Sequence, residues 1–119
     1  KRSKQCRQHV VWKISDKTSA DFLSERLQSM LMLMDESRNQ QRHILVHCAM
    51  GVSRSAALCA AWLIARKQMA LQQAMDTIRL VRPEVCPNLG FIASLRALEG
   101  CDGDIDKARI RLERKNDLE

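Results

Sequence analysis

The sequence lacks a long apolar run, a paired-cysteine motif and any internal repeat, and these absences exclude several classes of protein. The longest apolar stretch, residues 56–65, is too short to cross a bilayer as a helix, which takes about 20 apolar residues. Five cysteines at irregular spacing, with no C-x-x-C pair and no signal peptide, fit neither a secreted disulfide framework nor a zinc site. We therefore expect a protein of a reducing compartment, the cytosol or the nucleus, without a membrane span.

The positive charge of the chain is concentrated at one end. The formal net charge is +6, and four basic residues, Lys1, Arg2, Lys4 and Arg7, lie at the very start. No aromatic residues interleave with them, so we expect a solvated terminus and no nucleic-acid partner. The whole chain has 119 residues, of which 45% are hydrophobic and 29% charged, and this balance predicts one small globular domain.

The first half of the chain contains both strand-like and helical patterns. Residues 9–14 are rich in β-branched and aromatic side chains and predict a strand that ends at a polar loop, residues 15–17. Apolar side chains recur at helical spacing over residues 22–34, which predicts a helix packed by one face, with its methionines in the core. The short apolar run at residues 44–46 predicts a buried central strand.

The second half is predicted to be mostly helical. Residues 55–67 are rich in alanine, and a further helix over residues 71–81 is expected to stop at Arg82-Pro83. Pro87-Asn88 predicts the start of another helix, and residues 104–119 alternate in charge sign as an exposed helix would. On the alanine-rich helix, one stripe consists of Leu58, Trp62 and Ala65.

The segment after the predicted central strand supplies the groups that phosphate-ester hydrolysis through a cysteine requires. Cys48 lies at a strand-to-helix junction, where a helix N-terminus and nearby cations favour the nucleophilic thiolate. The backbone N–H groups of residues 49–54 can surround an anion, and Gly51 allows a backbone conformation or close approach that other residues resist. Arg54 can hold two phosphate oxygens through its planar guanidinium, and Ser55 can donate to the sulfur when the phosphoenzyme is hydrolysed.

The pattern H-C-x-x-G-x-x-R-S at residues 47–55 resembles the signature of the protein tyrosine phosphatase superfamily and is most similar to its dual-specificity branch. The resemblance implies an α/β fold: a parallel-dominated central sheet flanked by helices, with the phosphate-binding loop between a strand and a helix. It also implies hydrolysis of phosphotyrosine and phosphoserine/threonine through a cysteinyl-phosphate intermediate, with no metal or other cofactor. The substrate-binding residues it implies are Ala49, Met50, Gly51, Val52, Ser53 and Arg54, with His47 ordering the loop.

The partner that this resemblance implies is a phosphorylated protein. Relatives that act on phosphoinositides tend to carry basic side chains at the variable positions of the loop. The variable positions in this chain are uncharged: Ala49, Met50, Val52 and Ser53. The sequence therefore favours phosphoprotein over phospholipid, and it leaves the preference between tyrosine and serine/threonine phosphate open.

Two further positions extend the resemblance beyond the loop. The run Pro87-Asn88-Leu89-Gly90-Phe91 is similar to the family's downstream motif, in which the asparagine, here Asn88, supports the phosphate loop. The family's general acid is an aspartate on a mobile loop upstream of the nucleophile, and Asp16 lies 32 positions before Cys48. Asp21 is the alternative, but with Thr18 it resembles a capping box, which favours a role at a helix start.

The predicted organisation is a basic segment at residues 1–8, a catalytic domain at residues 9–100 and a charged tail at residues 101–119. The domain resembles the C-terminal part of the family's domain, and two strands alone make a marginal sheet. The alternative function is therefore a catalytically weak phosphoprotein-binding or regulatory module. Sulfur transfer by a rhodanese-type loop is a third class, which Gly51, Arg54 and Ser55 disfavour. The sequence does not indicate an oligomeric state.

Overall fold

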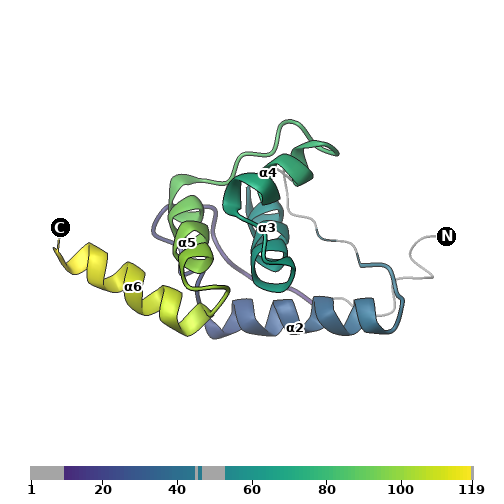
Figure 1. Cartoon of the computed structure of the whole chain (residues 1–119), viewed down its shortest axis with the longest axis horizontal. Helices are drawn as coiled ribbons and strands as arrows, with labels where there is room; N and C mark the ends of the chain where they lie inside the picture. Colours follow the sequence, from purple (N-terminus) through teal and green to yellow (C-terminus); the bar gives the residue numbers. More distant parts are fainter. Residues whose placement is uncertain (1–9, 45, 47–52, 119) are drawn as a thin grey trace.

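The computed structural model describes residues 10–44, 46 and 53–118 of the chain. Helices make up most of this part of the molecule (Figure 1). Within these residues, no helix has both the length and the apolar character needed to cross a membrane. The helices are α2 (Glu25–Asn39), α3 (Arg54–Lys67), α4 (Leu71–Arg79), α5 (Leu89–Gly100) and α6 (Ile105–Leu118).

Helix α3 lies at the centre, and α2, α4 and α5 pack around it (Figure 1). The stripe of Leu58, Trp62 and Ala65 read from the sequence is partly buried and packs against the core. Mostly small side chains of α3 are fully buried, and a face of alanines lets neighbouring helices approach the α3 backbone closely. The buried residues of α3 are Ala56, Ala57, Ala60, Ala61 and Ile64.

Helix α2 begins later than the sequence pattern predicts. The predicted start was residue 22, but the helix starts at Glu25 and its N-cap residue, Ser24, makes no side-chain capping bond. Phe22 and Leu23 are both buried at 2% exposure, so the chain enters the core before it turns into the helix. The prediction of core methionines is confirmed for Met30, which is buried, and wrong for Met32, which is 57% exposed.

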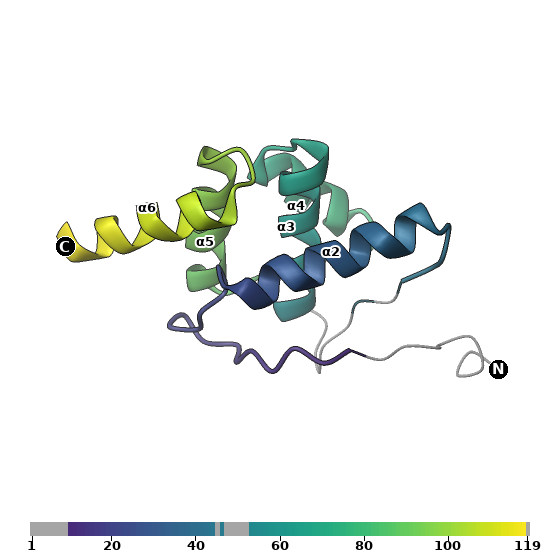
Figure 2. The same cartoon turned by 90° about the horizontal axis from the view of Figure 1, so that it is seen from below.

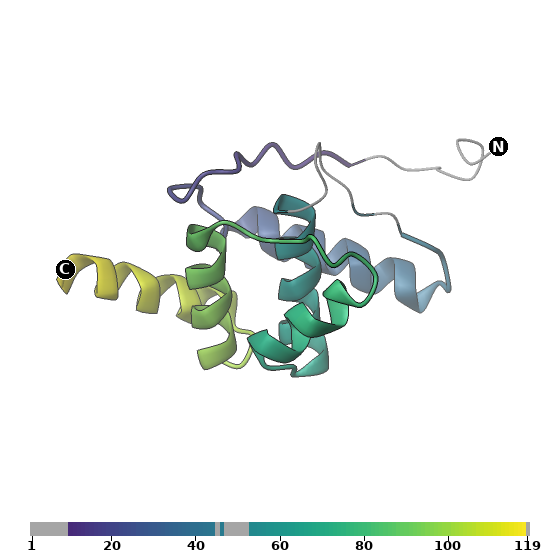
Figure 3. The same ribbon diagram turned by 90° about the horizontal axis from the view of Figure 1, so that it is seen from above.

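Aromatic rings fix the segment before α2 to the rest of the molecule. Trp12 stacks on Phe22 with their centroids 5.7 Å apart, and Phe22 packs on Phe91 of α5 at 5.2 Å. Arg26 of α2 donates to the carbonyl oxygen of Val11 at 2.6 Å. As Figures 2 and 3 show, this purple segment passes the end of the molecule where α3 and α5 begin.

A polar contact joins α2 to α3 near their C-terminal ends. Asp35 accepts a hydrogen bond from Trp62 Nε1 at 2.9 Å through Oδ1 and one from Arg66 Nε at 2.7 Å through Oδ2. Arg38 and Lys67 lie 5.7 and 5.8 Å from the centre of the Trp62 ring, within the range of cation–π attraction. This contact holds α2 across α3.

Helix α6 packs on α5 through its first turns. Ile105 and Ala108 are buried, whereas Ile110 is 50% exposed. The predicted helix in this region is present, and only its later part projects away from the other helices (Figure 1).

The predicted sheet is not confirmed. Residues 10–14, the described part of the first predicted strand, form no strand, and neither do Ile44 and Val46 of the second. A strand needs a neighbour to accept and donate its ladder hydrogen bonds, and no partner strand is found among residues 10–44, 46 and 53–118. Residues 9 and 45, which complete the two predicted strands, lie outside the described residues.

Candidate functional site

Three segments far apart in the sequence meet at the carboxylate of Asp16. Ser53 Oγ donates to Asp16 Oδ1 at 2.7 Å across 37 positions of sequence. Asn88 Nδ2 donates to the same oxygen at 2.8 Å across 72 positions. The backbone N–H of Asn88 in turn donates to Ser53 Oγ at 3.1 Å, which closes a ring of three residues. We call this group the Asp16 cluster.

Ser53 belongs to the predicted phosphate loop and is the N-cap residue of α3. It is only 5% exposed. A serine at this position ordinarily accepts a hydrogen bond from the first helical turn, but Ser53 makes no such capping bond. Its hydroxyl donates to Asp16 instead, so the loop residue before Arg54 is tied to the segment expected to supply the acid.

Asn88 uses both ends of its amide. Its Oδ1 accepts a hydrogen bond from the backbone N–H of Phe91 at 2.9 Å and so caps α5, as the sequence predicted for a helix entry. Its Nδ2 reaches Asp16. The cap fixes the orientation of the side chain, because rotating the amide to release Asp16 would also break the bond to Phe91.

Arg54, the first residue of α3, also contacts the segment that carries Asp16. Its Nη1 donates to the carbonyl oxygen of Ile14 at 3.4 Å, which is long for a hydrogen bond. Arg54 is partly buried, and so is Ser55 in the same helical turn.

The environment of Asp16 favours its ionised form. The hydrogen bond from Ser53, then that from Asn88, lowers the pKa of Asp16 below its ordinary value, and the positive charge of Arg54 adds to the effect. Desolvation acts in the opposite direction but is outweighed, since the side chain stays largely open to solvent. Asp16 is therefore a carboxylate at neutral pH in this arrangement.

The structure separates the two candidate acids. Asp16 is in the cluster, whereas Asp21 is exposed, precedes the first residue of α2 and is not the N-cap of that helix. The capping role predicted for Asp21 is therefore wrong, because burial of Phe22 and Leu23 moves the helix start beyond it. The remaining predicted site residues lie outside the described residues: His47, Cys48, Ala49, Met50, Gly51 and Val52.

Gly90 is a residue of the site that the sequence analysis did not single out as functional. A Cβ atom added to it would come within 2.7 Å of the carbonyl carbon and Cα of Thr18, so the backbone of the segment that carries Asp16 packs directly on α5. The signal available in the sequence was a glycine in the first turn of a helix, where glycine is unfavourable unless close approach requires it.

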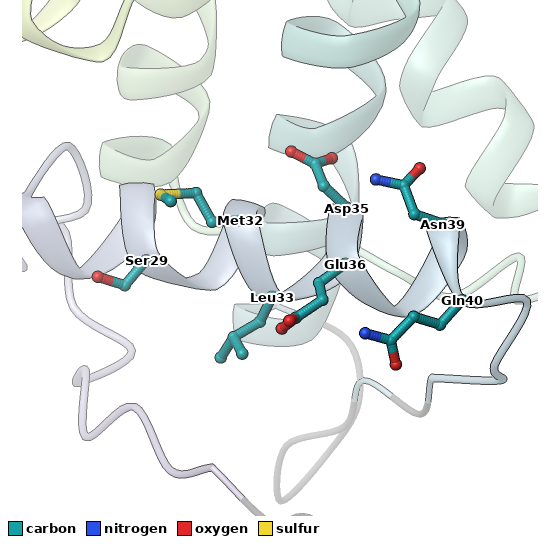
Figure 4. Close-up of a pocket in the computed structure, with 7 residues that line it drawn as sticks. All are labelled: Ser29, Met32, Leu33, Asp35, Glu36, Asn39 and Gln40. Atoms are coloured by element: carbon teal, nitrogen blue, oxygen red, sulfur yellow. The ribbon is translucent and has the colours of Figure 1, made fainter.

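A surface hollow lies elsewhere, along α2, and shares no residue with the Asp16 cluster (Figure 4). Among the described residues, no group of three His, Cys, Asp or Glu side chains is placed to hold a metal ion. The hollow is lined by Ser29, Met32, Leu33, Asp35, Glu36, Asn39 and Gln40.

Comparison with known proteins identifies the family. A family model described as "Dual specificity phosphatase, catalytic domain" matches residues 1–101. The chain belongs to the dual specificity phosphatase family. Dual specificity protein phosphatase 5 of Homo sapiens is 36% identical to it over 100 residues, which cover 82% of this chain and 26% of that protein. The chain thus matches about a quarter of this relative's length.

Solved phosphatase folds resemble the structure over most of its length. Human tyrosine phosphatase-like serine/threonine/tyrosine-interacting protein aligns with a TM-score of 0.74 and 26% identity, covering 79% of this chain and 62% of that one. Human DUSP28 aligns with a TM-score of 0.68 and 30% identity, covering 72% of this chain and 57% of that one. The dual specificity phosphatase fold therefore accounts for the helical arrangement around the Asp16 cluster.

Proposed function

We propose that this chain is a cysteine-dependent protein phosphatase domain that hydrolyses phosphotyrosine and phosphoserine/threonine in proteins. Family membership supports phosphatase chemistry, and the signature at residues 47–55 supplies the nucleophile and the phosphate-binding groups. We place it in a reducing compartment, the cytosol or nucleus, because a catalytic thiolate must stay reduced to act. The parallel sheet of the family, with residues 44–46 as a central strand, is part of the same proposal.

The observation that carries the proposal is the Asp16 cluster. The family's general acid precedes the nucleophile on a separate loop, and Asp16 is bonded to Ser53, which lies five residues after Cys48 in the signature. The contact with Ser53, a residue of the signature, supports the role of Asp16 as the general acid, because such an acid must lie near the bound ester oxygen. Among the described residues, Asp21 makes no such contact.

The reaction proceeds in two steps. In the first, the thiolate of Cys48 attacks phosphorus and forms the S–P bond, the ester P–O bond breaks, and protonated Asp16 gives its proton to the leaving oxygen. In the second, the Asp16 carboxylate takes a proton from water, the water oxygen bonds to phosphorus, and the S–P bond breaks to release inorganic phosphate and the thiolate. Arg54 and the backbone N–H groups of residues 49–54 stabilise the charge on the phosphate oxygens in both steps.

Hydrolysis of a small aryl phosphate by the folded chain tests this function. We expect Cys48→Ser to abolish turnover and Asp16→Ala to lower it roughly a hundredfold, in the range for loss of a general acid. Cys86→Ser is the matched control, because Cys86 is an exposed thiol outside the signature, and it is expected to keep wild-type turnover. Turnover that survives Cys48→Ser would rule out the cysteine mechanism.

A second candidate function, a phosphoprotein-binding module with weak turnover, is favoured by one observation. Asp16 is held as a carboxylate by two donors, and an ionised acid cannot protonate a leaving group. This function predicts that a folded wild-type chain binds a phosphopeptide without hydrolysing it. Isothermal titration with a phosphopeptide and its unphosphorylated counterpart, together with assay of released phosphate, separates the two functions.

A further inference from the structure

We propose that the starts of α3 and α5 form a clamp on residues 14–18, which fixes Asp16 by one carboxylate oxygen and leaves the other oxygen to carry the proton. Ser53 and Asn88 are positioning residues of this clamp. The inference rests on the proposed function, since it assigns how that function's acid is held.

The clamp contacts the acid segment at three successive points. Arg54 of α3 donates to the carbonyl oxygen of Ile14, two residues before Asp16. Ser53 and Asn88 bind the carboxylate itself. Gly90 of α5 lies against the backbone of Thr18, two residues after Asp16. Contacts before, at and after Asp16 define both the position and the direction of its side chain.

Both hydrogen bonds to the carboxylate end on Oδ1, at 2.7 and 2.8 Å. Among the described residues, no hydrogen bond to Oδ2 is found. Oδ1 can keep accepting from Ser53 and Asn88 whichever protonation state the group is in, because a protonated carboxyl retains an acceptor oxygen. The proton therefore resides on Oδ2, and the acid can gain and lose it without leaving the clamp.

The hydroxyl of Ser53 gives independent support. Serine at an N-cap stabilises its helix by about 1 kcal/mol through a capping bond. Ser53 occupies the N-cap of α3 but forgoes that bond, donating to Asp16 and accepting from the backbone of Asn88. Ser53 thus occupies a capping position, but its hydroxyl binds the Asp16 carboxylate and not the helix backbone. This arrangement is expected if the role of the hydroxyl is to hold Asp16.

The charges that face Asp16 come from few groups. On α3 the facing group is the cation Arg54, and the first turn of α5, residues 89–92, contains no charged side chain. The acid segment itself carries Lys13 and Lys17, both exposed. Residues 47–52 lie outside the described residues. Among the described groups, the neutral donors Ser53 and Asn88 are thus the main determinants of when Asp16 takes up its proton.

The clamp has two opposing effects on catalysis. It positions the acid, which raises the rate of proton transfer, but its donors also favour the carboxylate, which lowers the fraction of acid that is protonated. Removing a donor therefore has a signature that a loss of fold stability does not have. The pH at which Asp16 loses its proton rises, while the rate with the protonated acid falls.

The experiment uses the full chain and the variants Ser53→Ala and Asn88→Asp. The aspartate of Asn88→Asp can still accept from Phe91 N–H and cap α5, but it cannot donate to Asp16 and adds a like charge beside it. The matched controls are Ser29→Ala and Asn39→Ala, which remove an exposed hydroxyl and an exposed amide on α2. Circular dichroism establishes that each variant is folded.

The first measurement is the pKa of Asp16, from the NMR titration of its carboxyl carbon, assigned with Asp16→Asn. We expect the pKa of Asp16 to rise in Ser53→Ala and further in Asn88→Asp, and to stay unchanged in the two controls. This readout requires no turnover. An Asp16 pKa that is the same in wild type and both variants would overturn the clamp.

The second measurement is the pH profile of kcat/KM for two aryl phosphates, one with a strongly acidic and one with a weakly acidic leaving phenol. For the weakly acidic phenol, we expect a loss of roughly tenfold to a hundredfold and an alkaline limb moved to higher pH. For the strongly acidic phenol, which needs little protonation, we expect a loss of no more than about threefold. Equal losses with both substrates would contradict a positioning role.

The two proposals fail in different ways. Absence of turnover from the folded wild-type chain, with the Asp16 pKa raised in the variants, would overturn the phosphatase function and leave a clamp that serves binding. Turnover that depends on Cys48, with leaving-group dependence unaltered in Ser53→Ala and Asn88→Asp, would support the function and overturn the inference.

Discussion

Replacing Gly90 by alanine tests the close packing between α5 and the segment that carries Asp16. Alanine in place of glycine inside a helix gains up to about 1 kcal/mol of stability. The new Cβ, however, would lie 2.7 Å from two backbone atoms of Thr18, which cannot rotate away as the end of a side chain can. Overpacking of this kind costs about 1–3 kcal/mol, so the clash outweighs the propensity and we expect a net loss of up to about 2 kcal/mol.

The same substitution should weaken the phosphatase activity proposed above, because Thr18 can move away from α5 only by shifting the segment that carries Asp16. We expect turnover of the aryl phosphate with the weakly acidic phenol to fall at least about tenfold, since small displacements of a catalytic group are costly. Urea unfolding gives the stability, and the phosphate-release assay gives the turnover.

Gly100→Ala is the matched control, at the other end of the same helix. There the added Cβ would meet only the guanidinium end of Arg111, a flexible side chain that can move at little cost. We expect this variant to be as stable as wild type or up to about 1 kcal/mol more stable, with unchanged turnover. If Gly90→Ala proved as stable and as active as Gly100→Ala, the argument for close packing on Thr18 would be refuted.

Three further predictions concern stability. Leu31→Ala should cost about 2–5 kcal/mol in urea unfolding because Leu31 is fully buried, whereas Met32→Ala, at an exposed position, should stay within about 0.5 kcal/mol of wild type. Asp35→Ala should cost about 1 kcal/mol, since it removes the acceptor of Trp62 Nε1 at a partly exposed site, and a loss under about 0.3 kcal/mol would mean that the contact does not hold α2. Because the folded pKa of Asp16 is lowered, its contribution to stability is present above about pH 4 and disappears as the pH falls through the folded pKa. Asp16→Asn should therefore show a flatter fall of unfolding free energy in acid than wild type, and parallel curves would contradict the assigned shift.

The helical parts of the fold were predictable because their signals are local. The alanine-rich run predicted α3, and Asn88 after Pro87 predicted the start of α5, since a cap depends only on neighbours along the chain. The stripe of Leu58, Trp62 and Ala65 does pack against the core, but only in part. The sequence did not show that the alanines would be the most deeply buried side chains, because their burial depends on how closely the other helices pack on α3. The start of α2 was misplaced because burial of Phe22 depends on Phe91, a contact across the molecule.

The residues of the candidate site could be predicted from the sequence, but the hydrogen bonds between them could not. Asp16 was selected from its distance to Cys48, and Asn88 from its motif, each by resemblance to a family. Their hydrogen bond joins positions 72 residues apart, and no periodicity or spacing in the sequence encodes it. The hydrogen bond from the Ser53 hydroxyl to Asp16 could not be predicted either, because the position of Ser53 in the sequence fits an ordinary helix cap.

The aromatic contacts among Trp12, Phe22 and Phe91 limit how the segment that carries Asp16 can move. Trp12 precedes Asp16 and Phe22 follows it; the two rings stack on each other, and Phe22 also packs on Phe91 of α5. The segment between Trp12 and Phe22 is therefore held at both of its ends. It cannot move as a rigid lid about a single hinge. The general acid proposed at Asp16 would then be in place before a substrate binds, and this segment could adjust only by changes within its own few residues.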